Sequence, residues 1–536
     1  MFGFTLSFSS FYFLIFLAFS LLIYWLTPKK YRYISLLIES IAFLLLTDWK
    51  SIFFVLFSTL VIFFSALYIW KNNKAQKEYI SQNKEKLSLD EKKAYKAKNK
   101  KKRKAVLVIG IVIVTLLLGV MKYLGFVLGS AKSLLGLFGV DFSFDLGNWF
   151  LPIGISFYTF QAISYLVDVY WGKFDSEKNV AKFALYMFYF PKFLQGPIVR
   201  YNEMQETMFS EKEFSYEQFT DGLKRMGYGY FKKMVIADCL MVFISYAFTH
   251  ENITSLSGLE SFLAIFFYFI QDYCDFSGYM DIAIGISNMF GIKLPENFNR
   301  PYFARGVDEY WRRWHITLGT WFKDYIFYPL SISKFSLGIG KFFKKFSKSL
   351  GQKMPAVFGL IVVWLLTGLW HGASWNYVLW GAYYGVIIIL SIFFEPLFNL
   401  FYNKTHISRD NIFIKIWQHI RTIFILIVGR IIFMTSSLSD AWTIFSNSFR
   451  VWDYSIKNLV DQLGYMSWIF AILFSIVVLV KDIIQECHPE STMLERFNKK
   501  PIVYRWIMML ILVVAIIWFG WYGSGLPHFA FGYTQF

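Results

Sequence analysis

Two histidines lie within strongly apolar sequence, and they are the side chains of this chain best suited to catalysis. His371 ends the apolar run 362–370 and precedes Gly372-Ala373-Ser374-Trp375, whereas His315 ends the run Tyr310-Trp311-Arg312-Arg313-Trp314. A neutral imidazole both accepts and returns a proton near pH 7, which is what activation of a hydroxyl toward an acyl carbon requires. We therefore predict that His371 and His315 form a catalytic pair. The alternative for either one is a hydrogen-bonded packing residue at a helix interface.

The surroundings of the two histidines suggest how each ring is held. Glycine beside His371 lets a backbone or a ligand come close to the imidazole, and tryptophans such as Trp370 provide walls. In one continuous helix, residues 311, 314, 315 and 318 would share a face, so we expect His315 on a helix within an interfacial segment at 308–329.

Other polar positions interrupt the apolar sequence and are expected to meet at the same site. Asp272, Asp275 and Asp281 lie between two apolar stretches, where acidic side chains need partners or a polar cavity. Asn297 lies in a proline-bounded linker, 295–302, that leads to the His315 segment. No carboxylate or cysteine lies three or four residues after His371, so no metal site is expected.

The composition determines the class of protein that carries these residues. Of 536 residues, 56% are hydrophobic and 21% aromatic, only 17% are charged, and the mean hydropathy is +0.44. These values exclude a soluble domain, a disordered or collagenous chain and a disulfide-rich secreted module. They predict an all-α polytopic integral membrane protein. We expect one membrane domain over 1–536, with about 11 transmembrane helices and further re-entrant and interfacial helices around a central tunnel.

The net charge of +18 is unevenly distributed and predicts the orientation in the membrane. Residues 71–104 contain 14 basic and 4 acidic residues, which is typical of a solvated cytoplasmic loop. Three apolar stretches precede this loop, so the N-terminus is expected outside, and the first stretch is expected to remain as a span. The lysines lack interleaved aromatic residues, so nucleic-acid binding is not expected. A basic aromatic segment at 339–349 is expected to lie on the cytoplasmic leaflet.

Six motifs, densest over 150–385, resemble those of the membrane-bound O-acyltransferase family, in its bacterial alginate O-acetyltransferase branch. They are Phe190-Pro191-Lys192, Gln195-Gly196-Pro197-Ile198, Asp275-Phe276-Ser277-Gly278-Tyr279, Glu296-Asn297-Phe298-Asn299-Arg300-Pro301-Tyr302, Tyr310-Trp311-Arg312-Arg313-Trp314-His315 and Gly368-Leu369-Trp370-His371-Gly372-Ala373-Ser374-Trp375. The resemblance implies that His371 is the catalytic histidine and His315 the second functional one. By motif position it assigns donor-binding or supporting roles to Arg312, Arg313, Trp314, Trp370, Gly372, Asn297 and Asp275.

The resemblance also implies an activity and a location. A multi-pass enzyme of the bacterial cell membrane would move an acetyl group from a cytoplasmic thioester, acetyl-CoA, to a polysaccharide hydroxyl outside. No bound cofactor is expected. The acceptor is either the polymer itself or a serine of a separate extracytoplasmic, serine-esterase-like acyltransferase.

Two alternatives stay open at this point. One is a teichoic acid D-alanyl transferase, whose donor is a carrier protein. The other is a transporter or flippase of polymer intermediates, because broken helices with intramembrane polar groups suit transport equally well.

Overall fold

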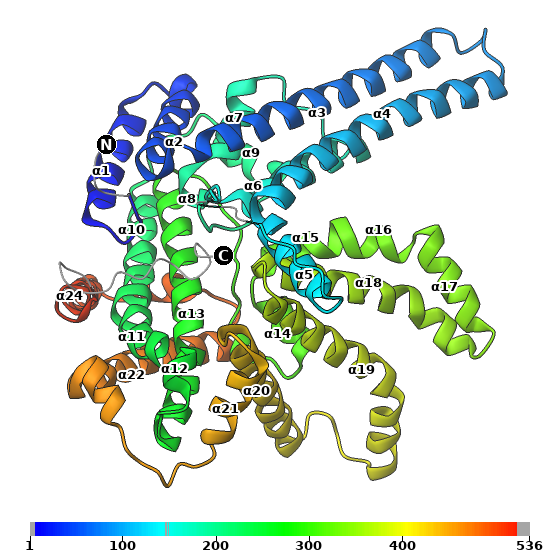
Figure 1. Ribbon diagram of the computed structural model, residues 1–536. Helices are drawn as coiled ribbons and strands as arrows, with labels where there is room; N and C mark the ends of the chain where they lie inside the picture. The colour runs from blue at the N-terminus through cyan, green and yellow to red at the C-terminus, as the bar shows by residue number, and fades with distance from the viewer. Residues whose placement is uncertain (1–5, 145–146, 148, 522–536) are drawn as a thin grey trace. The chain divides into compact units, whose positions relative to one another are not determined.

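The computed structural model describes residues 6–144, 147 and 149–521, and these residues are arranged almost entirely as helices (Figure 1). The only β pairing among them is an isolated antiparallel bridge between Phe298 and Trp314. The predicted all-α class is therefore confirmed. Contacts between Cα atoms divide the described residues into two compact units. One runs up to Thr220 and includes Ile286–Pro295, and the other contains Asp221–Gly285 and the described residues from Glu296 onward.

The first unit is made of the N-terminal helices. They are α1 (Phe11–Leu26), α2 (Arg32–Asp48), α3 (Ser51–Gln82), α4 (Leu89–Leu118), α5 (Leu124–Gly136), α6 (Ile155–Trp171), α7 (Val180–Phe188), α8 (Phe190–Phe193) and α9 (Tyr201–Met208), with a 3₁₀ turn at Lys29–Tyr31. A π-helical turn at Gly119–Tyr123 joins α4 to α5.

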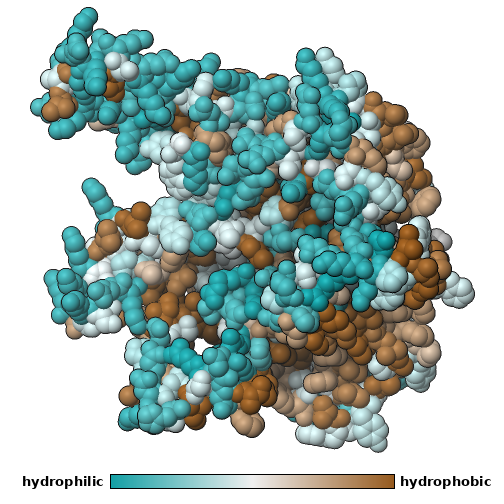
Figure 2. Space-filling model, turned by 180° about the vertical axis from the view of Figure 1, so that it is seen from behind, coloured by the Kyte–Doolittle hydropathy of each residue, from teal (hydrophilic) through white to brown (hydrophobic). Residues whose placement is uncertain are grey.

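The basic segment 71–104, which was expected as a solvated cytoplasmic loop, is helical over most of its length. It forms the far ends of α3 and α4, which lie side by side as an antiparallel hairpin (Figure 1). Lysine, alanine and glutamate favour helix, and a capping box between Ser88 and Glu91 starts α4. Arg103 donates to Asn72 and Gln76 across the hairpin, at 3.1 and 2.9 Å. The end of the hairpin presents a hydrophilic surface (Figure 2).

The second unit contains the segments singled out for chemistry. Its helices are α10 (Tyr216–Tyr230, from Asp221 on), α11 (Asp238–Ala247), α12 (His250–Ile253), α13 (Gly258–Met289, up to Gly285), α14 (Val307–Arg313), α15 (Ile316–Phe322), α16 (Tyr328–Ser331), α17 (Lys334–Lys344), α18 (Lys348–His371), α19 (Trp375–Thr405), α20 (Ile412–Met434), α21 (Leu438–Asn447), α22 (Lys457–Cys487), α23 (Met493–Asn498) and α24 (Ile502–Phe519). Shorter elements are a 3₁₀ turn at Pro301–Phe303 and π-helical turns at Phe231–Ala237 and Lys323–Phe327.

Seven of the described helical segments are long and apolar enough to cross a membrane. They are α3, the continuous helix Leu89–Gly136, α18, α19, α20, α22 and α24. One shorter apolar helix, α1, has 16 residues. The prediction of about 11 transmembrane helices stays a prediction beyond these seven candidate spans. The surface of α24 is almost entirely exposed and apolar, as expected for lipid contact.

Glycines allow α18 and α19 to pack closely. A Cβ atom on Gly368 would collide with the carbonyl oxygen of Tyr377, and one on Gly381 would collide with the carbonyl oxygen of Trp364. Small residues let helix backbones approach in this way in membrane proteins. The close packing fixes the end of α18, which carries His371, against the first turns of α19.

Candidate active site

His315 lies in a break between two short helices. The structure ends α14 at Arg313, leaves Trp314 extended and places His315 in the left-handed region at φ 47°. The expectation that residues 311, 314, 315 and 318 share one face of a single helix is therefore wrong. Backbone pairing with the preceding linker produces the break, because Asn299 donates its N–H to the Arg313 carbonyl at 2.9 Å and Ile316 donates to the Asn297 carbonyl at 3.1 Å.

The side chain of Asn297 holds the imidazole of His315. Its Oδ1 accepts the backbone N–H and the hydroxyl of Thr317, at 2.9 and 3.0 Å, and lies 3.3 Å from Nδ1 of His315. The Thr317 N–H identifies this amide atom as the oxygen, so a neutral His315 must carry its proton on Nδ1 and present Nε2 as an acceptor. His315 is outside the seven candidate spans, and burial lowers its pKa to about 3. Asn297 is thus brought to the second histidine, as predicted.

His371 is the last residue of α18 and is enclosed by aromatic rings. The centroids of Trp370, Trp380 and Phe433 lie 4.9, 4.8 and 5.3 Å from the imidazole centroid, and His371 is only 2% exposed. A side chain at Gly372 would collide with the ring of Tyr377. Glycine at this position therefore lets the Tyr377 ring lie close to the backbone beside His371, as the sequence predicted. The imidazole therefore lies inside the protein and away from lipid.

Trp370 brings the two histidines together although they are 56 residues apart in the sequence. Its ring lies 5.5 Å from His315 and 4.9 Å from His371, measured between centroids. Phe276 packs against the other side of His315, at 4.8 Å. The predicted pair is thus grouped around one buried tryptophan.

Arg430 is a buried charged residue beside this pair that the sequence analysis missed. It lies in α20, is 6% exposed, donates from Nε to Asp272 at 3.0 Å, and forms an ion pair with the same carboxylate, whose oxygen lies 2.9 Å from Nη2. Nη2 also donates to the hydroxyls of Tyr302 and Tyr310, at 3.2 and 3.0 Å. Its guanidinium carbon is 5.1 Å from the ring centre of Trp314. Its position could have been recognised in the sequence, because Arg430 is a charged residue within an apolar stretch long enough to cross a membrane.

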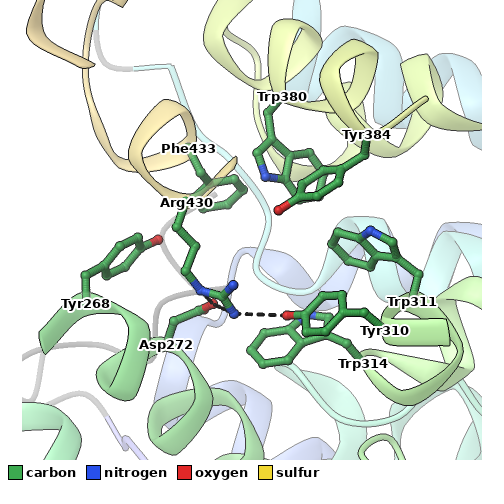
Figure 3. Close-up of a pocket in the computed structure, with 9 residues that line it drawn as sticks. All are labelled: Tyr268, Asp272, Tyr310, Trp311, Trp314, Trp380, Tyr384, Arg430 and Phe433. Carbon is green, nitrogen blue, oxygen red and sulfur yellow. Dashed lines mark hydrogen bonds and ion pairs between the residues drawn. The ribbon is translucent and has the colours of Figure 1, made fainter. Parts of the chain in front are cut away.

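A small cavity of about 20 Å³ lies between α13, α14, α19 and α20 (Figure 3). The guanidinium of Arg430 points across it toward Asp272 and the hydroxyl of Tyr310. Its lining residues are Tyr268, Asp272, Tyr310, Trp311, Trp314, Trp380, Tyr384, Arg430 and Phe433. Two of them, Trp380 and Phe433, also contact His371, so the pocket lies next to the imidazole.

The three aspartates of α13 each have a basic partner, as their position in apolar sequence required. Besides the pair of Asp272 with Arg430, Asp275 binds Lys233 at 2.6 Å, and Asp281 binds Lys232 at 2.7 Å. Both lysines belong to the π-helical turn Phe231–Ala237, which displaces them toward α13. Asp275 therefore supports the packing of α13, and the contacts described for it are with Lys233 and not with either histidine.

The two arginines of α14 have different environments. The side chain of Arg312 is 67% exposed and pairs with Asp308 at 2.8 Å. Arg313 is 19% exposed and binds Glu309 at 2.7 Å and Glu486 at 3.1 Å. Arg312 therefore retains access to an external anion, whereas Arg313 is already neutralised by two carboxylates.

Comparison with known proteins finds a family model and several relatives that match the part of the chain containing these residues. Residues 174–438, which contain both histidines and Arg430, match the family model of MBOAT, the membrane-bound O-acyltransferase family. The chain is 32% identical over 353 residues to a probable alginate O-acetylase of Azotobacter vinelandii, covering 66% of this chain and 64% of the relative. It is 33% identical over 309 residues to a peptidoglycan O-acetyltransferase of Helicobacter pylori, covering 53% and 54%.

A more distant relative acts on another polymer. The chain is 28% identical over 250 residues to a teichoic acid D-alanyltransferase of Bacillus subtilis, covering 45% of this chain and 59% of the relative. The match to the Azotobacter protein spans slightly less than two thirds of that relative's length.

Proposed function

Because the chain belongs to the membrane-bound O-acyltransferase family, we propose that it is a membrane enzyme that transfers an acetyl group to a hydroxyl of an extracellular or cell-wall polysaccharide. The donor is a cytoplasmic thioester, acetyl-CoA. Relatives named for alginate and for peptidoglycan O-acetylation support an acetyl group and a polysaccharide acceptor. The observation that carries the proposal is the grouping of His315 and His371 around the buried ring of Trp370, within the segment that matches the family.

The proposed chemistry assigns the proton transfer to His371. Its imidazole takes the proton of the acceptor hydroxyl while the hydroxyl oxygen attacks the thioester carbonyl carbon. A C–O bond forms, the C–S bond breaks, and the imidazole returns the proton to the departing thiolate. The products are an ester and a free thiol. The aromatic rings around His371 exclude water, which would otherwise hydrolyse the thioester.

His315 has a different part in this proposal. With its proton on Nδ1 toward Asn297, its Nε2 accepts a hydrogen bond, which suits an amide N–H in the arm of the donor. This tautomer favours orientation of the donor over stabilisation of negative charge, because an acceptor nitrogen cannot donate to an oxyanion.

The anionic part of the donor is proposed to stay at the cytoplasmic face. Arg312 and the lysines of α17 are the cations that hold its phosphates, because Arg312 is exposed and Lys341 and Lys344 end an amphipathic helix. Arg313 instead keeps α14 in place through Glu309 and Glu486. The proposed orientation has the N-terminus outside a bacterial cell membrane and the basic hairpin of α3 and α4 inside, because basic segments stay on the cytoplasmic side.

The acceptor hydroxyl is proposed to belong to the polymer or to a serine of a secreted partner acyltransferase that completes the transfer. The nearest alternative is D-alanyl transfer, which the teichoic acid relative supports at lower identity. A transporter of polymer intermediates remains the alternative that involves no bond formation.

Replacement of His371 tests the proposal. Membranes that contain the His371→Gln variant, incubated with acetyl-labelled CoA, are expected to incorporate about 10² to 10⁴ times less alkali-labile label into the polymer fraction than wild type, because the general base is lost. His488→Gln is the matched control, since His488 is 54% exposed and pairs only weakly with Glu490, at 3.7 Å. Undiminished ester formation in a well-folded His371→Gln variant would refute the proposed mechanism.

A further inference from the structure

The hairpin formed by the far ends of α3 and α4 has a charge distribution that the proposed activity does not use (Figure 1). Residues 71–77 of α3 and 97–104 of α4 contain nine basic and no acidic residues. The distal part of the hairpin, 78–96, contains five basic and four acidic residues and is nearly neutral. Almost all of the excess positive charge therefore lies at the base of the hairpin, next to the apolar parts of the two helices.

Contacts across the hairpin place the two charged segments at the same level. Asn72 accepts a hydrogen bond from Arg103 at 3.1 Å and donates one to Asn99 at 3.2 Å. With this register, Trp70, where the apolar part of α3 ends, lies nearly opposite Ala105, where the apolar part of α4 begins. The lysines of both helices therefore follow directly on an apolar region that is long enough to cross a membrane.

Trp70 marks the level at which hydrocarbon gives way to water. Tryptophan concentrates at this boundary in membrane proteins. The Nζ atoms of Lys178 and Lys74 lie 4.9 and 5.7 Å from the centre of the Trp70 ring. Ammonium groups are thus already gathered at this level, as expected where lysines extend toward lipid headgroups.

The lysines at the base of the hairpin are within reach of the headgroups. A helix rises about 1.5 Å per residue, so Lys77 and Lys98 lie about 10 Å beyond the level of Trp70 and Ala105. The polar region of one leaflet is roughly 5 to 8 Å thick, and charges act through a further ~8 Å at physiological salt. Eight exposed lysines lie within this range, and we call them the basic collar: Lys71, Lys74, Lys77, Lys98, Lys100, Lys101, Lys102 and Lys104.

The charge of the basic collar is available to an external anion. Among the described residues, the only carboxylate within ion-pair distance of a collar lysine is that of Glu78, at 3.8 Å from Lys74. Arg103 is different, because it is buried and donates to Asn72 and Gln76. The inner face of the hairpin is therefore held together by polar contacts, while the collar lysines face outward.

We propose that the basic collar binds anionic phospholipids, with lysine ammonium groups paired to the headgroup phosphates around α3 and α4. A soluble acidic protein fits the charges less well, because it would meet the distal end of the hairpin first, and that end is nearly neutral. The inference depends on α3 and α4 crossing the membrane and not on the acyl-transfer chemistry. It can therefore be tested separately from the proposed function.

Lipid retention by the purified full-length protein tests the proposal. The protein is mixed in detergent micelles with equal amounts of anionic phosphatidylglycerol and zwitterionic phosphatidylcholine, and the bound lipids are counted by native mass spectrometry. The collar variant combines four exposed substitutions in α4, Lys100→Gln, Lys101→Gln, Lys102→Gln and Lys104→Gln. Its preference for phosphatidylglycerol is expected to fall at least about fivefold, which is the contribution of one lysine at an anionic membrane surface.

The same hairpin supplies a matched control. The tip variant removes the same charge from the distal part, with Lys84→Gln, Lys86→Gln, Lys92→Gln and Lys93→Gln. These lysines lie roughly 20 Å from the level of Trp70, so the wild-type preference is expected to change by less than about twofold. Arginine at the four collar positions is expected to restore the preference, because pairing with phosphate requires a positive charge.

Several results would overturn the proposal. A folded collar variant with the wild-type preference would assign the lysines to another partner, such as a soluble acidic protein. An equal loss in the tip variant would show that height above the apolar region is irrelevant. Loss of the wild-type preference when inorganic phosphate replaces chloride at constant ionic strength would identify a site for free phosphate.

Two further outcomes keep the test decisive. If the collar variant does not fold, the double variant Lys101→Gln with Lys102→Gln takes its place and is expected to lose at least about twofold, and an unchanged preference would overturn the proposal. A wild-type protein that retains phosphatidylglycerol in the expected pattern but transfers no acetyl group would refute the proposed function and support the basic collar.

Discussion

The buried pair of Arg430 with Asp272 provides the sharpest energetic test of the site. Arg430→Met keeps much of the side-chain length but removes the guanidinium that donates to Asp272, Tyr302 and Tyr310. The carboxylate of Asp272 then loses its only described cation, in a pocket where few water molecules can replace it. Arg421→Met on the same helix is the control, because the hydrogen bond described for its guanidinium is an exposed one, to the carbonyl of Arg305.

The expected loss of stability follows from the burial of the two side chains. Removal of one partner from a buried ion pair costs about 3 to 5 kcal/mol. The side chain of Arg430 is 7% exposed and that of Asp272 is 20% exposed. The partial exposure of the carboxylate favours the lower end, about 3 kcal/mol. The double variant Arg430→Met with Asp272→Asn leaves no unpaired charge, so we expect it to lose only about 1 to 2 kcal/mol.

Reversible unfolding in mixed micelles, followed by tryptophan fluorescence, measures these differences as a double-mutant cycle. The predicted coupling between Arg430 and Asp272 is about 2 kcal/mol or more. A loss below about 1 kcal/mol for Arg430→Met, or a double variant less stable than both single variants, would show that the pair is not a buried, mutually dependent unit.

Two further predictions concern helix packing and pH. Gly368→Ala should lower the unfolding free energy by at least about 2 kcal/mol and reduce acyl transfer, because the new Cβ collides with the backbone of Tyr377. The control is Gly338→Ala in α17, which should be neutral or slightly stabilising because no atom lies within 4 Å of the new Cβ. Equal unfolding free energies of the two variants would contradict this reasoning. Burial lowers the pKa of His315 to about 3. Between about pH 6.5 and pH 3, the imidazole of His315 is therefore protonated in the unfolded state but neutral in the folded state. The unfolding free energy should therefore fall by up to about 1.4 kcal/mol per pH unit as the pH drops through that range, and His315→Gln should lose this part of the slope; an unaltered slope would show that His315 titrates normally.

The helical class and the two histidines were predictable from the sequence because they depend on local signals. Long apolar stretches can only be helices in a membrane, and His371 and His315 are conspicuous in apolar surroundings. The need for partners around Asp272, Asp275 and Asp281 followed from the cost of burying charge. The structure supplies a basic residue for each one.

The remaining features depend on contacts between distant segments. The break at His315 arises from backbone pairing with Asn297 and Asn299, and no local propensity predicts a left-handed histidine. The pocket depends on α20, where Arg430 comes 158 residues after Asp272. The charge of segment 71–104 indicates a solvated segment but not its secondary structure, whereas its lysine, alanine and glutamate content and the capping signal at Ser88 favour helix.

Helix α20 carries both Arg430, the cation that lines the pocket, and Phe433, a ring that packs against His371. Arg430 and Phe433 are three residues apart and project from nearly the same side of this helix. A shift or rotation of α20 would therefore disturb the ion pair and the packing against His371 in a single movement. A molecule that displaced the guanidinium of Arg430 would therefore also shift Phe433 and change the surroundings of His371 without contacting the histidine itself.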